Sequence, residues 1–149
     1  MSATSDTKKQ LLEELSADNV TPLKIRNLCK NNADIITNND IRIRLWTLLL
    51  LGSNYKLSEH VFHRSITYCD EYNVLQADIR RTRQEVDQFS SDLYCNVLTD
   101  LLNTFCFEHG VKYKQGMNEI CAIFVYIIDI KESQSLVLAY DLFSAFMYR

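Results

Sequence analysis

The stretch Ser90–Gly110, SSDLYCNVLTDLLNTFCFEHG, decides the fold class. Serine and aspartate at its start are residues that cap helix N-termini, and the glycine at its end is typical of a helix C-terminus. Between them, apolar residues recur every three or four positions, as on one face of an amphipathic helix: Leu93, Val97, Leu98, Leu101, Leu102 and Phe105. The pattern predicts a long helix over about 91–109.

Similar patterns predict helices along the rest of the chain. After a disordered leader over residues 1–6, a first helix follows, and others are expected at about 22–31, 39–51, 57–73, 115–130 and 132–148. The 149 residues include 3 glycines and 1 proline, which is few turn-formers for a protein of many short strands. We therefore expect an all-α fold of about seven helices, with residues 7–149 in one domain.

Composition excludes several classes of protein. The net charge is −3 and no basic stripe is present, which argues against nucleic-acid binding. The N-terminus lacks the apolar region of a signal peptide, and five cysteines without a Cys-x-x-Cys pair predict reduced thiols in a cytoplasmic protein. The most apolar run, 120–130, is shorter than the 17–25 residues or so of a membrane span, so we interpret it as a buried helix.

Two short polar segments carry the residues of functional interest. The arginine segment is LQADIRRT at residues 75–82, and the glutamine segment is YKQGM at residues 113–117. An arginine placed against a γ-phosphate stabilises the charge that develops during GTP hydrolysis, and a glutamine orients the attacking water. Neither role needs a shifted pKa, so a helical scaffold that positions both side chains is sufficient.

These segments resemble the signature motifs of the TBC-domain family, GTPase-activating proteins that act on Rab small GTPases. The family pattern Ile-x-x-Asp-x-x-Arg corresponds to Leu75, Asp78 and Arg81, with leucine in place of isoleucine. The pattern Tyr-x-Gln-Gly is matched in full at residues 113–116. An upstream Arg-x-x-x-Trp motif is matched by Arg42 and Trp46. The resemblance covers about 40–149, and a family domain usually continues further, so we expect a domain that is incomplete at its C-terminus.

The resemblance implies a role for each matched residue. Arg81 and Gln115 would enter the nucleotide pocket of a Rab in its GTP form as arginine and glutamine fingers, and GTP and Mg²⁺ would belong to that partner. The remaining motif residues would support these fingers or the GTPase-binding surface: Asp78, Thr82, Tyr113, Gly116, Arg42 and Trp46. The chain itself is expected to hold no cofactor and no metal, and to reach endomembranes only through its partners in vesicle traffic.

Two other functional readings remain open. One is a non-catalytic TBC-like adaptor that binds a GTPase or trafficking partner without activating it. The other is a truncated product that does not fold stably alone, because the last helix carries apolar residues that expect partners: Leu136, Tyr140, Phe143 and Met147. The presence of both finger residues favours the activator, since an adaptor has no chemical need for them.

The candidate residues also have structural explanations. Arg81 could be a surface arginine in a polar turn, and Gln115 a polar residue that satisfies free N–H groups in a first helical turn. Asn118 and Glu119 could line a groove or simply be solvated. His60 and His63 share a helical face and Cys69 follows, but a fourth ligand is not evident, so a zinc site is not expected.

A geometric requirement follows from the order of the segments. They flank the long helix, whose length is about 28 Å at 1.5 Å per residue. For Arg81 and Gln115 to reach one phosphate, a connecting segment must run back along that helix. We expect residues 83–90 to do so in extended form, with Val86 and Phe89 held in the core.

Overall fold

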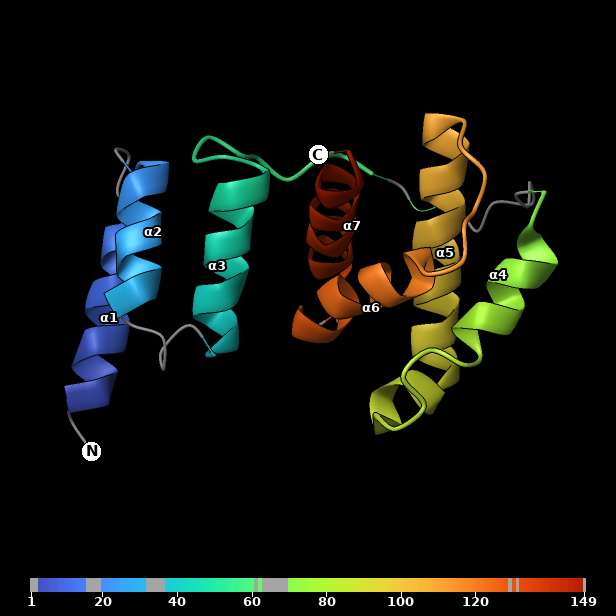
Figure 1. The fold of residues 1–149 in the computed structure, drawn as a ribbon, viewed down its shortest axis with the longest axis horizontal. Coiled ribbons are helices and arrows are strands. Elements are labelled where there is room, and N and C mark those ends of the chain that lie inside the picture. Colours follow the sequence, from blue (N-terminus) through green and yellow to red (C-terminus); the bar gives the residue numbers. More distant parts are fainter. Residues whose placement is uncertain are drawn as a thin grey trace. The chain divides into compact units, whose positions relative to one another are not determined.

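The structure, a computed structural model, describes residues 3–15, 20–31, 37–60, 62, 70–128, 130 and 132–148. Seven α-helices and one 3₁₀ helix account for most of the described residues, and no strand occurs among them (Figure 1). The all-α prediction is therefore confirmed. The elements are α1 (Ala3–Leu15), α2 (Pro22–Asn31), α3 (Asn39–Leu50), α4 (Tyr72–Ile79), η1 (Asp87–Ser90), α5 (Asp92–His109), α6 (Met117–Ile127) and α7 (Ser133–Met147).

The chain forms two compact units, residues 1–56 and residues 57–148, and each is described by itself. In the first unit α1 packs against α3. Its core consists of buried aliphatic side chains from three helices: Leu11, Leu15, Ile25, Ile41, Leu45 and Leu48. Trp46 is partly buried and packs against this core.

Local capping sets the helix ends in the first unit. The Thr21 hydroxyl accepts a hydrogen bond from the N–H of Lys24 at 3.2 Å, so Thr21 caps α2. Asn38 caps α3 by accepting from the N–H of Asp40. After α3, Gly52 adopts a left-handed conformation with φ of 92°. The first helix begins at Ala3, so the expected disordered leader is wrong for residues 3–6.

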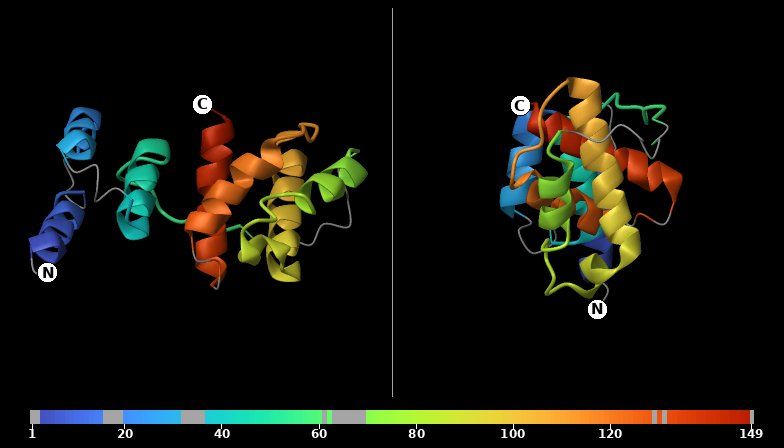
Figure 2. Two further views of the ribbon diagram at one scale, coloured as in Figure 1. Left: turned by 60° about the horizontal axis from the view of Figure 1, so that its bottom comes forward. Right: turned by 90° about the vertical axis from the view of Figure 1, so that its right-hand side faces the viewer.

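In the second unit, α4 and α6 pack on α5 and on each other, and α7 packs on α6 (Figures 1 and 2). The predicted caps of α5 are confirmed: Ser91 accepts from the N–H of Tyr94, and Gly110 ends the helix in a left-handed conformation. The last helix buries Tyr140 and Phe143, two of the residues expected to need partners, inside this unit. The apolar face of α7 is therefore largely covered by the described chain itself.

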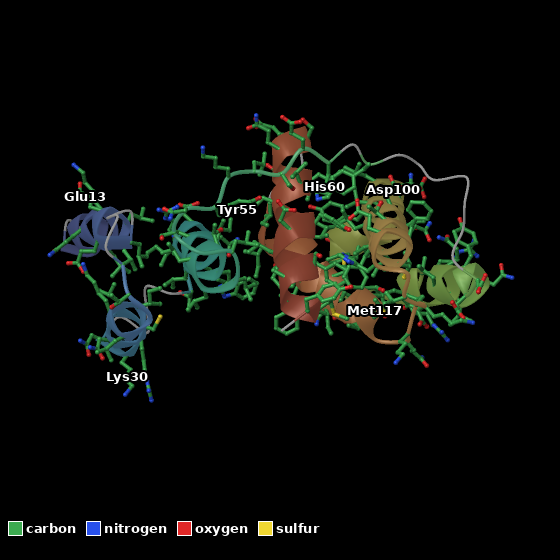
Figure 3. The ribbon with its side chains drawn as sticks, turned by 90° about the horizontal axis from the view of Figure 1, so that it is seen from above. Glu13, Lys30, Tyr55, His60, Asp100 and Met117 are labelled. Atoms are coloured by element: carbon green, nitrogen blue, oxygen red, sulfur yellow. The ribbon has the colours of Figure 1, made fainter. Side chains whose placement is uncertain are left out.

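The prediction of a helix over 57–73 is wrong for the described residues before Tyr72. Residues 57–60 and 62 are not helical, 70–71 form a turn, and α4 begins only at Tyr72. The N–H and hydroxyl of Ser58 instead donate to Asp141 on α7, and His60 lies between α5 and α7 (Figure 3). His63 and Cys69 lie outside the described residues.

The segment before α5 also differs from the expectation. Residues 81–85 form turns, a bend follows, and η1 precedes α5, so the stretch 83–90 is not extended. Phe89 is 3% exposed and its ring contacts those of Tyr94 and Tyr126, whereas Val86 is only half-buried. The core position of Phe89 is therefore confirmed.

The chain that runs back along α5 is the stretch 111–116, which follows the helix rather than preceding it (Figure 1). Near its start, the Lys112 ammonium lies 3.6 Å from the Asp70 carboxylate and 3.5 Å from that of Glu71, at the beginning of α4. The segment then passes along α4 toward Asp78, which the Tyr113 hydroxyl contacts. This return path brings the glutamine segment to the end of α4.

None of the described helices combines the length and hydrophobicity that a bilayer crossing requires.

Candidate functional site

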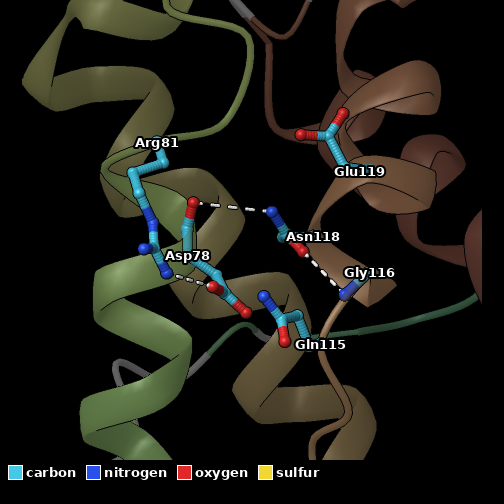
Figure 4. A pocket seen from close by; sticks show the side chains of 6 residues that line it. All are labelled: Asp78, Arg81, Gln115, Gly116, Asn118 and Glu119. Atoms are coloured by element: carbon cyan, nitrogen blue, oxygen red, sulfur yellow. Dashed lines mark hydrogen bonds and ion pairs between the residues drawn. The ribbon is translucent and has the colours of Figure 1, made fainter.

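A pocket of about 200 Å³ lies where the C-terminal end of α4 meets the N-terminal end of α6. Six residues line it: Asp78, Arg81, Gln115, Gly116, Asn118 and Glu119 (Figure 4). The structure thus brings the arginine segment and the glutamine segment to one hollow of the surface. Four residues predicted from the motifs are among the six.

Asp78 is the buried centre of this site, with a relative exposure of 4%. One carboxylate oxygen, Oδ1, accepts a hydrogen bond from Nη2 of Arg81 at 2.8 Å. The other, Oδ2, lies 3.0 Å from the hydroxyl of Tyr113. A carboxylate removed from water is tolerated only when such donors replace its hydration. Asp78 therefore ties Arg81 to the glutamine segment.

Arg81 lies one turn after Asp78 and keeps most of its surface in solvent. Its side chain is 68% exposed although it is paired with a buried carboxylate. In Figure 4 the guanidinium is turned toward Asp78, and Gln115 lies on the other side of that carboxylate. A guanidinium has five N–H donors, so the bond to Asp78 leaves others for a second anion. Arg80 is exposed and does not line the pocket, which agrees with the choice of Arg81 by motif spacing.

Tyr113 fixes the turn that carries Gln115. The side chain is 4% exposed, and its hydroxyl lies 3.0 Å from Oδ2 of Asp78 and 3.0 Å from Oδ1 of Asn118. Burial, and then the hydrogen bond to Asp78, raise the pKa of Tyr113 well above its usual value. The hydroxyl therefore stays protonated and acts as a donor.

Gln115 and Gly116 precede α6 and do not belong to it, so the helix predicted over 115–130 starts later than expected. Gly116 is the N-cap residue and has φ of 98°, a conformation that L-residues rarely adopt. A Cβ at this position would meet nothing within 4 Å, so space does not require the glycine. The backbone conformation requires the glycine, and it places the exposed Gln115 at the rim of the pocket.

Asn118, which the sequence left open, also belongs to the site and contacts Thr82, which was predicted as motif support. Asn118 is 5% exposed, and its amide donates to Oγ1 of Thr82 at 2.8 Å and accepts from the N–H of Gly116 at 3.1 Å. Thr82 is itself 1% exposed and donates to the carbonyl of Asp78. The sequence signal for these residues was their position beside the motifs, but nothing in it indicated that they would meet.

Glu119 adds a second carboxylate to the pocket and forms an ion pair with Arg83. Its Oε2 lies 3.0 Å from Nε of Arg83, and both side chains are partly exposed. Arg83 has a positive φ of 46°, the only non-glycine residue with one among those described. Such a conformation costs energy in a non-glycine residue and is common at functional sites. The ion pair compensates the charge that Glu119 would otherwise present to an approaching anion.

The remaining predicted residues, Arg42 and Trp46, lie on α3 in the first unit. The hydrogen bonds that Arg42 makes to described residues go to the carbonyl of Thr37 at 2.9 Å and to the side chain of Asn39 at 3.5 Å. Arg42 therefore braces the start of α3 through neutral acceptors.

His60, one of the three residues considered above as possible zinc ligands, contacts two carboxylates. Its ring nitrogens lie 3.3 Å from Oε1 of Glu108 and 3.5 Å from Oδ1 of Asp141. The side chains of the described residues include no group of three or more potential ligands arranged to hold a metal ion. His60 thus places the 57–60 segment beside carboxylates of α5 and α7, and Ser58 adds hydrogen bonds to Asp141 on α7.

The pocket presents the exposed guanidinium of Arg81 and the exposed amide of Gln115. Beneath them lie buried side chains that are hydrogen-bonded to their neighbours. The pocket's volume of about 200 Å³ is below the range of roughly 300–1,000 Å³ that is usual for sites that enclose a small molecule. The pocket is therefore small for a site that would enclose a whole nucleotide by itself.

Comparison with known proteins gives one match. Residues 39–149 match the family model RabGAP-TBC, described as the Rab-GTPase-TBC domain. No curated protein and no solved structure matches the chain. The matched range includes both segments that line the pocket.

Proposed function

Because this chain belongs to the Rab-GTPase-TBC domain family, we propose that it is a GTPase-activating protein for a Rab-family GTPase. In this proposal Arg81 and Gln115 act in trans on GTP held by the partner. The partner supplies Mg²⁺ as well as the nucleotide, and this chain supplies no cofactor. The protein would act in vesicle traffic and reach endomembranes through its Rab.

The observation that carries the proposal is the arrangement of the two finger residues. They come from segments on opposite sides of α5 in the sequence, yet both line one pocket and both expose their side chains. An exposed arginine alone would be unremarkable on a protein surface. An arginine and a glutamine on one hollow, each supported by buried hydrogen bonds, are the pair that phosphoryl transfer to water uses.

Each finger has a separate task at the γ-phosphate. Arg81 would donate to the phosphoryl oxygens as negative charge moves onto them, while its bond to Asp78 limits the positions of the guanidinium. The carbonyl oxygen of the Gln115 amide would accept a hydrogen bond from the attacking water and hold that water in line with the γ-phosphate. This arrangement lowers the barrier by positioning and electrostatics, without a proton-transfer group in this chain.

The test is hydrolysis of GTP by a panel of Rab GTPases with and without this protein. We expect acceleration of at least one member, lost by roughly 10³-fold or more in Arg81→Ala and strongly reduced in Gln115→Ala. Matched controls are Arg80→Ala and Gln88→Ala, which remove exposed side chains of the same types outside the pocket. Both controls should leave the acceleration intact.

Two results would contradict the proposal. If Arg81→Ala stimulated hydrolysis as well as the wild type, the finger mechanism would be wrong. If the folded wild-type protein bound a GTP-loaded Rab without accelerating hydrolysis, the non-catalytic adaptor would be the better description.

A further inference from the structure

The side chain of Asn118 joins the two segments that carry the fingers. Its Nδ2 donates to Oγ1 of Thr82 at 2.8 Å and lies 3.5 Å from the carbonyl oxygen of Asp78, both in the arginine segment. Its Oδ1 accepts from the N–H of Gly116 at 3.1 Å and lies 3.0 Å from the hydroxyl of Tyr113, both in the glutamine segment. Thus the nitrogen of the amide contacts one segment and the oxygen contacts the other.

The contacts use both ends of the amide group. A carboxamide has two N–H donors and an oxygen that accepts: the nitrogen faces Thr82 and the carbonyl of Asp78, and the oxygen accepts from the N–H of Gly116. The group is 5% exposed, so water does not offer alternative partners of equal quality. The orientation of the amide is therefore determined, and with it the separation of the two segments.

The contacted residues are direct neighbours of the fingers. Thr82 follows Arg81 and Gly116 follows Gln115 in the chain. A displacement at either neighbour moves the adjacent finger by a similar distance, because one peptide unit connects them. A misplacement of about 1 Å can reduce a reaction rate by roughly a hundredfold.

We propose that Asn118 is a positioning residue that sets the separation of Arg81 and Gln115 on the partner's nucleotide. Its hydrogen bonds go to neither finger side chain, and it acts through Thr82 and Gly116. The inference rests on the proposed GTPase-activating function. It adds that Asn118 helps to determine the rate of GTP hydrolysis when the Rab is saturated with activator. A purely structural role would instead reduce the amount of folded protein and leave the folded fraction fully active.

The experiment is single-turnover GTP hydrolysis by the Rab that the wild type activates, at increasing concentrations of activator. Asn118→Ala should lower the rate at saturation between about tenfold and a hundredfold. The half-saturating concentration should stay close to that of the wild type, since the exposed surface is unchanged. Thermal melting and circular dichroism determine the folded fraction for each variant.

A matched pair at Thr82 tests the same bridge from its other end. Thr82→Val has the shape of threonine but no hydroxyl, so it should reproduce the loss seen in Asn118→Ala. Thr82→Ser keeps the hydroxyl and should retain most of the rate at saturation. This pair carries the test if Asn118→Ala melts below the assay temperature.

Coupling to the fingers supplies a further readout. In an Arg81→Ala background, Asn118→Ala should reduce the residual rate by a smaller factor than in the wild type, because one of the positioned groups is already gone. A loss of the same factor in both backgrounds would overturn the proposal.

The possible failures are distinguishable. If folded Asn118→Ala and Thr82→Val activate the Rab at the wild-type rate, or change only the half-saturating concentration, the positioning role is wrong and the proposed function stands. If the wild type activates no Rab in the panel, the proposed function fails and this inference with it.

Discussion

The Nη2 atom of Arg81 lies 2.8 Å from Oδ1 of Asp78, so an arginine that is 68% exposed is paired with a carboxylate that is 4% exposed. The pair connects the surface with the interior, because the other oxygen of Asp78 is bound by the buried Tyr113. Charge-assisted bonds of this kind hold a long side chain in a narrow range of positions.

Arg81→Lys should lose nearly as much activity as Arg81→Ala. An ammonium is a point charge and cannot bond Asp78 and a phosphate through a planar fork as a guanidinium can. We expect a loss of about 10³-fold in GTPase acceleration, with a decrease in the free energy of unfolding of no more than about 1–3 kcal/mol, because Oδ1 of the buried Asp78 loses its guanidinium donor. GTP hydrolysis and urea denaturation measure the two quantities. The control is Arg80→Lys. If Arg81→Lys retained activity, a positive charge alone would be sufficient at this position.

Tyr113→Phe should lower the free energy of unfolding by about 1–3 kcal/mol, since Oδ2 of Asp78 loses its buried donor. The pH dependence has a defined sign. The pKa of Tyr113 is raised by burial and by the bond to Asp78, so its contribution is complete below about pH 10, the value for an unfolded tyrosine, and falls above it.

The difference between wild type and Tyr113→Phe should therefore be constant through neutral pH and shrink in strong alkali. Denaturant unfolding at several pH values measures it. Tyr126→Phe, on a residue that is 50% exposed, is the control and should change little. A difference that grew with rising pH would contradict the assignment.

Gly116→Ala should affect both stability and activity. The added methyl group meets open space, so the cost of about 1–2 kcal/mol comes from the backbone at φ of 98°. Relief of this strain would also move Gln115. Gly52 offers a matched control, because it has φ of 92° and equally open surroundings in the first unit.

Both glycine variants should melt at lower temperature, but only Gly116→Ala should lower the saturating rate of GTP hydrolysis. Equal activity losses in the two variants would show that stability, and not the position of Gln115, controls the rate.

Asp141→Ala should release the 57–60 segment from α7. Asp141 is 9% exposed, and both of its oxygens lie 2.7 Å from the Ser58 hydroxyl. Hydrogen bonds to a charged group contribute about 1.5–3 kcal/mol each, and we expect a loss of stability in that range. Urea denaturation measures it, with the exposed Glu59→Ala as control. Faster hydrogen exchange at 57–60 in Asp141→Ala alone would locate the change.

The parts of the fold that sequence predicted well depend on local interactions. The ends of α5 follow from Ser91 and Gly110, whose contacts lie within one turn. The missed parts depend on distant ones. Ser58 lies in a stretch with helical periodicity, but its partner Asp141 is 83 positions away. That tertiary bond and the bonds of His60 favour a non-helical course for 57–60.

The candidate site divides in the same way. The motif pattern selected Arg81 and Gln115, since their spacing to Asp78 and Gly116 is visible in the sequence. The role of Asn118 was not visible, because its partner Thr82 is 36 positions away. The return path along α5 was predicted for the segment before the helix, whereas the segment after it turns back. The length of a segment does not say which of two connections takes that course.

The contrast between exposed fingers and their buried supports makes the site separable by mutation. In a deep mutational scan that measures abundance and activity independently, substitutions of Arg81 and Gln115 should give abundant but inactive protein. Substitutions of Thr82, Tyr113 and Asp78, each at most 4% exposed, should reduce abundance as well. Two neighbouring codons, 81 and 82, would then fall into different phenotypic classes, although both belong to one motif.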